Sequence, residues 1–291
     1  MKLGLFGINM GPCSTPEASA RVAQAAEAAG FESVWAGEHV VLPDPQEPPS
    51  PLPPTYPMLD PNIAFAFLAG QTKTIRMGTG IIILPQRNPL VLAKEMASLD
   101  VLSGGRLIFG VGIGYLKPEF GALGIPFAQK GPRTLDYVEA MRAIWSQDNP
   151  AHQGQFVSFS GIQAFPKPVQ QSGPPVVFGG MTPQAFQRSV THGNGWYGFA
   201  LDADGTKKCL DGLKAAQEQN KRPSELGKLE ISVTPLGRVD LDMAKRFADL
   251  GVDRLVSLFP PKGKELFSLN SSETEITDYI KEVGDTVVGK V

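Results

Sequence analysis

The chain has 291 residues, of which 42% are apolar, and its 27 Lys and Arg residues nearly balance its 29 Asp and Glu residues. This apolar content supports a substantial core and excludes an intrinsically disordered chain. The balanced charge provides no global basic field, so neither nucleic acid nor an anionic membrane surface is expected as a partner.

The two cysteines, Cys13 and Cys209, lie far apart in the sequence and form no CxxC pair. This spacing argues against a disulfide framework and a cysteine-rich metal site, and it fits the reducing cytoplasm. No apolar stretch is long enough to span a bilayer. The N-terminal sequence MKLGLFGINMG is too short for the apolar region of a signal peptide, so we interpret it as a buried strand in a cytoplasmic protein.

Short apolar runs recur along the chain, as expected for parallel strands that are covered on both faces. We predict strands at 2–9, 33–37, 75–83, 107–114, 175–180, 195–200, 230–237 and 254–259. Helical patterns separate these runs, and the first has a capping Ser or Thr, a proline in the first turn and a terminal glycine. The predicted helices are 14–30, 61–72, 88–105, 131–147, 182–192, 204–220, 241–250 and 272–285.

Eight strands that alternate with eight helices indicate an α/β fold, the (β/α)₈ TIM barrel, in a single domain over residues 1–291. A doubly wound sheet has the same alternation, but the lack of a linker or composition break favours the closed barrel. Two segments lie outside this pattern. Residues 43–61 are rich in proline and predict a stiff, extended loop after the second strand. Residues 153–168 alternate like a small hairpin inserted before the fifth strand.

The second predicted strand ends in two polar residues, Glu38 and His39, within the segment SVWAGEHVVLP. Barrel enzymes build their active sites at the C-terminal ends of strands, and histidine suits proton transfer near neutral pH. Of the three histidines, His39 is the best placed, because His152 and His192 fall at an insertion edge and a helix end. A His39 that only hydrogen-bonds the proline-rich loop is an equally good interpretation from position alone.

Glycines mark the ends of two other predicted strands. In GTGIIILPQRNP they indicate a bulge or a close approach of a ligand to the backbone, although a simple irregularity of the sheet gives the same pattern. On the fourth strand, Gly110, Gly112 and Gly114 would leave a flat space for a planar ring. These glycines are not a dinucleotide fingerprint, because no helix follows them directly.

After the fifth strand, the segment GGMTPQAF places Gly179, Gly180 and Met181 before a helix that begins near Thr182. The free N–H groups of such a turn and helix terminus bind phosphate well. Ordinary helix capping by Thr182 explains the same residues.

In their order along the chain, these motifs resemble the bacterial luciferase-like oxidoreductases, and most closely the branch that uses the deazaflavin coenzyme F420. The resemblance extends from residue 1 to about residue 200 and weakens beyond it. It is carried by AAEAAGFESVWAGEH, YPMLDPNIAFAFLAGQTKTIRMGTGIIILPQRNPLVLAKEMASLDVLSGGRLIFGVGIGY, RTLDYVEAMRAIW, and PPVVFGG followed by GNGWY.

The resemblance implies an F420-dependent oxidoreductase that holds the coenzyme ring at the C-terminal mouth of a TIM barrel. His39 would then lie beside the ring as proton donor or acceptor, with Glu38 at the position of a usual acidic residue. A non-proline cis peptide between Gly80 and Ile81 would support one face of the ring. The resemblance also implies that the coenzyme phosphate is held by the backbone of the residues 179–181.

One position departs from the pattern of the family. Relatives that oxidise a sugar phosphate carry a glutamate after the strand-four glycines, where this chain has Tyr115. Tyrosine is a poor general acid at neutral pH but can donate a hydrogen bond, so Tyr115 is a candidate catalytic residue for another substrate class. The predicted substrate pocket, which favours apolar or aromatic molecules, is lined by Trp35, Tyr56, Phe199 and Met10.

Two alternative functions follow from the same residues. The first is an FMN-dependent monooxygenase of the same superfamily. The second is a non-catalytic F420-binding protein, which is suggested by Tyr115 in place of the acid. Because relatives are often dimers through the barrel wall, the resemblance also implies a homodimer.

Overall fold

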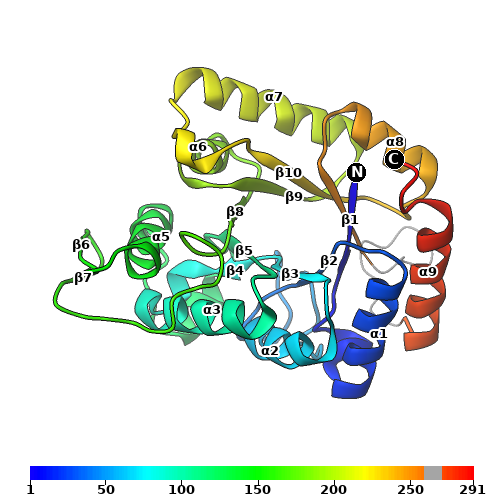
Figure 1. Cartoon of the computed structure of the whole chain (residues 1–291), viewed down its shortest axis with the longest axis horizontal. Helices are drawn as coiled ribbons and strands as arrows, with labels where there is room; N and C mark the ends of the chain where they lie inside the picture. Colours follow the sequence, from blue (N-terminus) through cyan, green and yellow to red (C-terminus); the bar gives the residue numbers. More distant parts are fainter. Residues whose placement is uncertain (259–270) are drawn as a thin grey trace.

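The computed structural model describes residues 1–258 and 271–291. Its centre is a closed barrel of parallel strands surrounded by helices (Figure 1). The barrel strands are β1 (Lys2–Phe6), β2 (Ser33–Ala36), β3 (Arg76–Thr79), β4 (Ile82–Ile83), β5 (Leu107–Gly112), β8 (Val176–Gly179), β9 (Gly195–Leu201), β10 (Glu230–Pro235) and β11 (Arg254–Ser257).

The strands pair in the order β3-β2-β1-β11-β10-β9-β8-β5, and a further pairing of β3 with β5 closes the barrel. The short strand β4 continues from β3 beyond the Gly80–Ile81 bond and also pairs with β5. The predicted (β/α)₈ barrel is therefore confirmed. The predicted strand 75–83 is broken in two, and residue 259 of the last predicted strand lies outside the described residues.

Each of the predicted helices is present, with ends that differ by at most two residues. The sequence did not predict the short α4, which lies between β5 and α5. The helices are α1 (Pro16–Ala28), α2 (Pro61–Gln71), α3 (Pro89–Ser103), α4 (Lys117–Ala122), α5 (Lys130–Ser146), α6 (Pro183–His192), α7 (Ala203–Gln219), α8 (Leu241–Asp249) and α9 (Glu273–Thr286).

Capping side chains define many of the helix starts. Asp60 accepts hydrogen bonds from the backbone N–H groups of Asn62 and Ile63, so α2 begins at Pro61. Ser272 and Glu275 form a reciprocal capping box at the start of α9. Such caps each contribute about 1 kcal/mol, and they make the helix starts predictable from local sequence.

The barrel interior is filled by aromatic side chains below its C-terminal mouth. Trp35 is fully buried and stacks on Tyr197, with ring centroids 5.1 Å apart. A Cβ atom at Gly78 would lie 2.6 Å from the Trp35 ring, so the neighbouring strand needs glycine at this point. Burial of a large apolar side chain contributes about 1.5–3 kcal/mol to folding stability. This interior layer therefore stabilises the barrel directly below its mouth.

The opposite end of the barrel is closed by a buried ion-pair network. The guanidinium group of Arg254 is fully buried and donates to Glu32 and Glu230 at 2.9 Å, and to the Ser232 hydroxyl at 3.0 Å. A buried charge is tolerated when it is paired and hydrogen-bonded in this way. The N-terminal end of the barrel is therefore sealed.

Of the two irregular segments expected at the barrel rim, the proline-rich loop borders the barrel, whereas the hairpin lies outside it, beside α5 (Figure 1). The proline-rich loop (residues 43–61) is tied to the strand-one connection, because Asn9 Nδ2 donates to the Leu59 carbonyl at 2.6 Å and Leu59 N donates to the Asn9 carbonyl at 2.8 Å. Its Leu52 side chain is buried in the interior cluster. The predicted hairpin is confirmed but is shorter than expected, with β6 (His152–Gln153) paired antiparallel to β7 (Ser158–Phe159).

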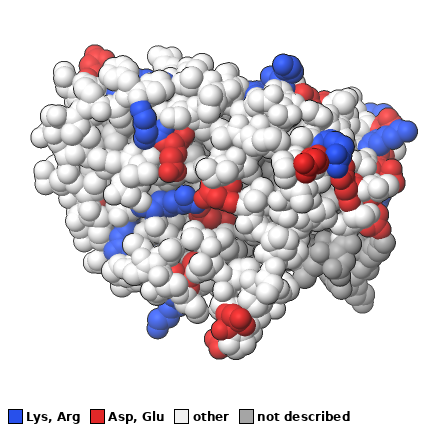
Figure 2. Space-filling model, turned by 90° about the horizontal axis from the view of Figure 1, so that it is seen from below, with Lys and Arg blue, Asp and Glu red and all other residues white. Residues whose placement is uncertain are grey.

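Figure 2 shows charged side chains of both signs scattered singly or in small groups over one face, with no broad patch of one sign. This distribution agrees with the nearly balanced composition. Among the described residues, none of the helices is both long and apolar enough to cross a membrane.

Candidate active site

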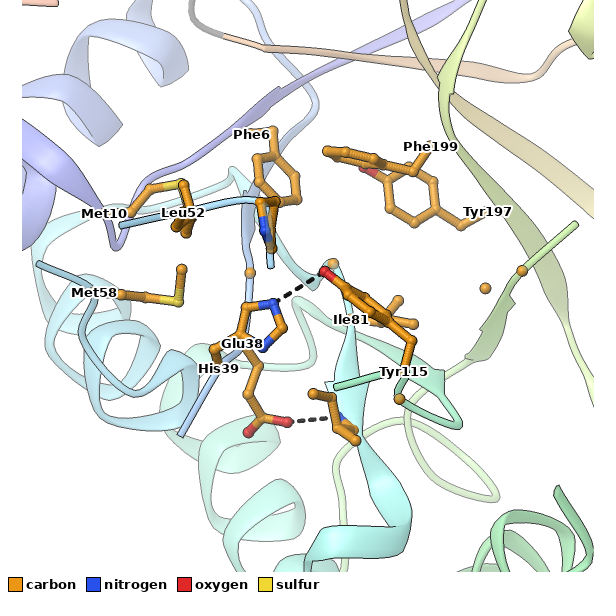
Figure 3. Close-up of a pocket in the computed structure, with 17 residues that line it drawn as sticks. Phe6, Met10, Glu38, His39, Leu52, Met58, Ile81, Tyr115, Tyr197 and Phe199 are labelled. Carbon is orange, nitrogen blue, oxygen red and sulfur yellow. Dashed lines mark hydrogen bonds between the residues drawn. The ribbon is translucent and has the colours of Figure 1, made fainter. Parts of the chain in front are cut away.

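A cavity of about 400 Å³ opens at the C-terminal ends of the barrel strands (Figure 3). Its volume lies within the usual range of small-molecule sites, and most of its wall is apolar. The residues that line it are Phe6, Met10, Gly37, Glu38, His39, Pro51, Leu52, Met58, Gly80, Ile81, Ile83, Gly114, Tyr115, Gly179, Gly180, Tyr197 and Phe199.

One wall of the cavity is built by Ile81. The peptide bond between Gly80 and Ile81 is cis, as the family resemblance implied. A Cβ atom at Gly112 would lie 2.0 Å from Ile81 Cδ1, and a Cβ atom at Gly179 would lie 2.8 Å from it. The expectation that Gly112 leaves open space for a ring is therefore wrong, because the Ile81 side chain fills that space. Gly114 does line the cavity.

His39 is held between two residues from the segment that follows β5. Its Nδ1 lies 3.2 Å from Glu119 Oε2. Its Nε2 lies 3.3 Å from the Tyr115 hydroxyl, a contact drawn in Figure 3. The other carboxylate oxygen of Glu119 accepts a hydrogen bond from Val40 N at 2.7 Å. The Glu119 side chain is fully buried, and that of His39 is 9% exposed. The imidazole is therefore fixed on both sides while it faces the cavity.

Local sequence explains why Glu119 reaches His39. Pro118 lies in the first turn of α4, where its missing N–H group costs no helical hydrogen bond, and Gly124 follows with φ +68°. The resulting short helix follows directly on Tyr115, so it carries Glu119 back over the end of β2. Both hydrogen-bonding partners of His39 thus come from five consecutive residues.

Tyr115 remains protonated near neutral pH. Burial, reinforced by the negative charge of Glu119, raises the pKa of Tyr115 to about 12. Its hydroxyl group is therefore able to donate a hydrogen bond to His39 or to a bound molecule.

Glu38 is adjacent to His39 in the sequence, but its carboxylate contacts other residues. Its buried carboxylate accepts hydrogen bonds from the backbone N–H of Ile83 and from the guanidinium group of Arg87, which also binds Asp60. Burial raises the pKa of Glu38, whereas Arg87 and the Ile83 N–H oppose that rise. These contacts tie the end of β2 to β4 and to the start of α2, and so they place Glu38 in a supporting position.

The predicted substrate-lining residues divide into two groups. Met10 and Phe199 line the cavity as expected. Trp35 does not, because it is fully buried beneath the mouth, where its Nε1 donates to Ser33. Tyr56 is also not part of the wall; its hydroxyl lies 2.5 Å from the position of a Cβ on Gly11. Both misassignments reflect side-chain direction, which a strand-end position does not reveal.

The predicted phosphate-binding segment borders the cavity only in part. Gly179 and Gly180 line it, but Met181 is 52% exposed and does not. The Thr182 hydroxyl accepts a hydrogen bond from Ala185 N at 3.3 Å and caps α6. The two glycines, and not the Met181 side chain, thus form this part of the cavity wall.

Two cations lie close to the start of α5, and one of them contacts a residue of the cavity wall. Lys130 Nζ donates to the carbonyl of Gly114 at 2.8 Å, and Arg188 Nη1 lies 3.3 Å from the position of a Cβ on Gly131. Within residues 1–258 and 271–291, neither cation has an acidic partner. Burial lowers the pKa of both groups. An anionic group beside Lys130 would therefore be favourable.

Sequence reasoning missed several residues of the site. The most important is Glu119, which lies outside any predicted strand end; its only sequence signal is the PEF segment in a proline-initiated turn four residues after Tyr115. The apolar residues that were missed include Phe6, Leu52, Met58 and Tyr197.

Comparisons with known proteins identify the family to which this chain is similar. A family model described as luciferase-like monooxygenase matches residues 6–246. An uncharacterized protein of Mycobacterium tuberculosis is 31% identical over 261 residues, which cover 86% of this chain and 89% of that protein.

Two further relatives carry names that indicate different cofactors. An F420-dependent hydroxymycolic acid dehydrogenase of Mycobacterium tuberculosis is 28% identical over 231 residues, which cover 78% of this chain and 61% of that protein. The oxygenase component of a flavin-dependent trigonelline monooxygenase of Acinetobacter baylyi is 30% identical over 172 residues, which cover 58% of this chain and 44% of that protein.

A solved structure of an F420-dependent secondary alcohol dehydrogenase with an F420–acetone adduct superposes with a TM-score of 0.79 at 17% identity. The match covers 100% of this chain and 99% of the other. It shows that the two proteins share the same fold.

Proposed function

Because this chain belongs to the luciferase-like monooxygenase family, we propose that it is an F420-dependent oxidoreductase that moves a hydride between the deazaflavin ring and an organic substrate. The observation that carries the proposal is His39, which faces an apolar cavity at the mouth of the barrel while Glu119 and Tyr115 hold its ring. The substrate class is an apolar or aromatic molecule, as the wall of the cavity favours.

The residues around the cavity fit the coenzyme. The apolar wall at Ile81 suits the face of a planar tricyclic ring, and it is held in place by the glycines at 112 and 179. The backbone at Gly180 lines the cavity, and the ammonium group of Lys130 contacts the cavity-lining Gly114, so a phosphate group bound there would find donors and positive charge.

When bound, the deazaflavin supplies a carbon centre that accepts or releases a hydride. In the direction of alcohol oxidation, His39 takes the hydroxyl proton of the substrate as the carbon loses its hydride, and a carbonyl group forms. In the direction of reduction, the protonated imidazole of His39 returns that proton to the carbonyl oxygen of the substrate. The Tyr115 hydroxyl, which is protonated at neutral pH, donates a hydrogen bond at the same place.

Glu38 has a positioning role in this proposal, because its carboxylate is already committed to Arg87 and to the Ile83 N–H. It holds the backbone before His39 against β4, which carries the Ile81 wall.

An FMN-dependent monooxygenase is the second candidate, favoured by the 30% identity to the flavin-dependent trigonelline monooxygenase component. The two candidates are separated by titrating the purified protein with F420 and with FMN, followed by fluorescence. We expect F420 to bind at least about tenfold more tightly, a difference of about 1.4 kcal/mol. Tighter binding of FMN, together with oxygen-dependent turnover, would contradict the proposal.

Turnover is then tested by following coenzyme absorbance with a panel of apolar secondary alcohols, ketones and activated alkenes. Reduction or oxidation of the coenzyme by one of these classes, lost in His39→Ala with coenzyme affinity retained, supports an enzyme. Tight binding with no turnover across the panel would support a coenzyme-binding protein instead.

A further inference from the structure

We propose that Glu119 is a positioning residue that fixes the proton of the neutral His39 ring on Nδ1, so that Nε2 is the basic nitrogen at the cavity. This inference rests on the proposed function, in which His39 transfers a proton. It adds the specific nitrogen that does so and the residue that selects it.

The two oxygens of Glu119 face two different partners. Oε1 accepts the backbone N–H of Val40 at 2.7 Å, and Oε2 lies 3.2 Å from His39 Nδ1. The carboxylate is fully buried, so water does not compete for either oxygen. A backbone N–H group can only donate, and it therefore fixes the orientation of the carboxylate beside the ring.

The donor and acceptor roles of the ring follow from this arrangement. An ionised carboxylate only accepts hydrogen bonds, so Nδ1 must carry the proton that Oε2 accepts. In the neutral ring, Nε2 is then the bare nitrogen, and it accepts from the Tyr115 hydroxyl at 3.3 Å. Tyr115 supplies that proton because its pKa is raised well above neutrality. The hydrogen bonds thus run in one direction, from Tyr115 through His39 to Glu119.

Residues 115–122 hold Tyr115 and Glu119 in fixed positions relative to the His39 ring. Tyr115 and Glu119 are four residues apart, and Pro118 and Phe120 lie beside Glu119 within the short helix; Phe120 is fully buried. The same segment therefore holds both ring nitrogens. A partner that fixes a histidine tautomer is a large factor in catalysis, because the wrong tautomer presents an N–H where a base is needed.

The proton position is measured directly by two-bond ¹H–¹⁵N correlation on protein labelled with ¹⁵N-histidine. The chain has only three histidines, and His39→Ala and His152→Ala assign their signals. At about pH 9, where an ordinary imidazole is neutral, we expect wild-type His39 to be the Nδ1–H tautomer. Once the signals are assigned, the wild-type spectrum alone tests the tautomer of His39.

The variant Glu119→Gln then tests the cause. The Gln carbonyl oxygen keeps the bond from Val40 N, so its NH₂ group faces Nδ1 and donates to it. The proton of His39 is expected to move to Nε2, and the rate of hydride transfer in a single turnover to fall at least about tenfold with unchanged coenzyme affinity.

Asp136→Asn is the matched control. Asp136 pairs with His152 Nε2 at 2.6 Å, away from the cavity, and its other oxygen accepts the backbone N–H groups of Phe156 and Val157. This variant is expected to change the tautomer of His152 and to leave the His39 signals and the rate unchanged.

An Nε2–H or doubly protonated His39 ring in the wild-type protein at about pH 9, or a Glu119→Gln variant that keeps the wild-type tautomer, overturns the inference. These spectra need no coenzyme. A tautomer that inverts as expected in a protein that binds neither F420 nor FMN would leave the role of Glu119 intact and would refute the proposed function instead.

Discussion

Two histidine–carboxylate pairs in this chain have nearly the same chemistry but very different surroundings. His39 pairs with Glu119 at 3.2 Å, and His152 pairs with Asp136 at 2.6 Å. The side chains are similarly buried, with exposed fractions of 9% and 0% in the first pair and 12% and 8% in the second. Neither the pair itself nor its burial distinguishes a catalytic candidate from a structural contact.

The difference lies in what else each pair contacts. His39 turns its second nitrogen toward Tyr115 and lines the cavity at the barrel mouth. Asp136, by contrast, also accepts two backbone N–H groups of the hairpin turn, and so it fastens β6 and β7 to α5. The two imidazoles therefore face different spaces: His39 lines the more enclosed, apolar cavity at the barrel mouth, whereas His152 lines a more open and more polar depression formed by the hairpin itself.

Removal of the two imidazoles should have the most unequal effects. His39→Ala is expected to lower the rate of hydride transfer by at least about 100-fold, because general acid–base catalysis is lost. His152→Ala is expected to change that rate by less than about twofold. Single-turnover absorbance of the coenzyme measures both rates, and equal losses in the two variants would erase the proposed distinction.

The carboxylate of the second pair should matter for stability rather than for rate. Asp136→Ala leaves the N–H groups of Phe156 and Val157 and the His152 ring without their acceptor. We expect the free energy of unfolding to fall by about 2–3 kcal/mol, measured by urea denaturation. The conservative Asp136→Asn, which keeps an acceptor oxygen, serves as its control and should lose less. A strong loss of hydride-transfer rate in Asp136→Asn would contradict a purely structural role.

Tyr115→Phe tests the second contact of His39. The hydroxyl group is lost while the ring remains, and a single hydrogen bond of about 0.5–1.5 kcal/mol corresponds to a decrease in rate of about two- to tenfold. Tyr137, which is partly buried on α5, offers Tyr137→Phe as a control that should leave the rate unchanged. No change of rate in Tyr115→Phe would show that the hydroxyl contributes nothing to His39.

The smallest effect concerns alkaline stability. The pKa of Tyr115 is raised to about 12 in the folded protein, above the ordinary value of 10.0, so the folded chain holds this proton more tightly than the unfolded chain. Its contribution to stability is present below about pH 10 and is lost as the pH rises toward about 12. Between those pH values, the free energy of unfolding, measured with urea, should therefore fall slightly more for the wild type than for Tyr115→Phe. An identical pH dependence would contradict the raised pKa.

The fold was largely predictable because its signals are local. Apolar runs gave the strands, and caps such as Thr182 gave the helix starts. The position of His39 at the cavity was predictable for the same reason, because it lies shortly after the end of β2 and barrel sites lie at strand ends. The motif resemblance correctly anticipated the cis bond between Gly80 and Ile81.

The errors concern side-chain direction and contacts between distant segments. Trp35 was placed in the cavity although it points into the barrel interior, and Gly112 was assigned open space that Ile81 fills. Glu119 was missed because it is 80 residues from His39 and lies on a helix too short to have a clear periodic pattern.

The sequence alone determined the alternation of strands and helices and the position of His39 at the barrel mouth, since each depends on residues close together in the chain. Only the tertiary structure decided which carboxylate meets that histidine. Glu38 precedes His39 in the sequence, but its carboxylate accepts hydrogen bonds from Arg87 and the Ile83 N–H. Glu119, which follows β5 in the chain, contacts His39 instead. The reason is physical: a hydrogen bond depends on distance and direction in space, and closure of the barrel sets both for residues that the chain itself keeps far apart.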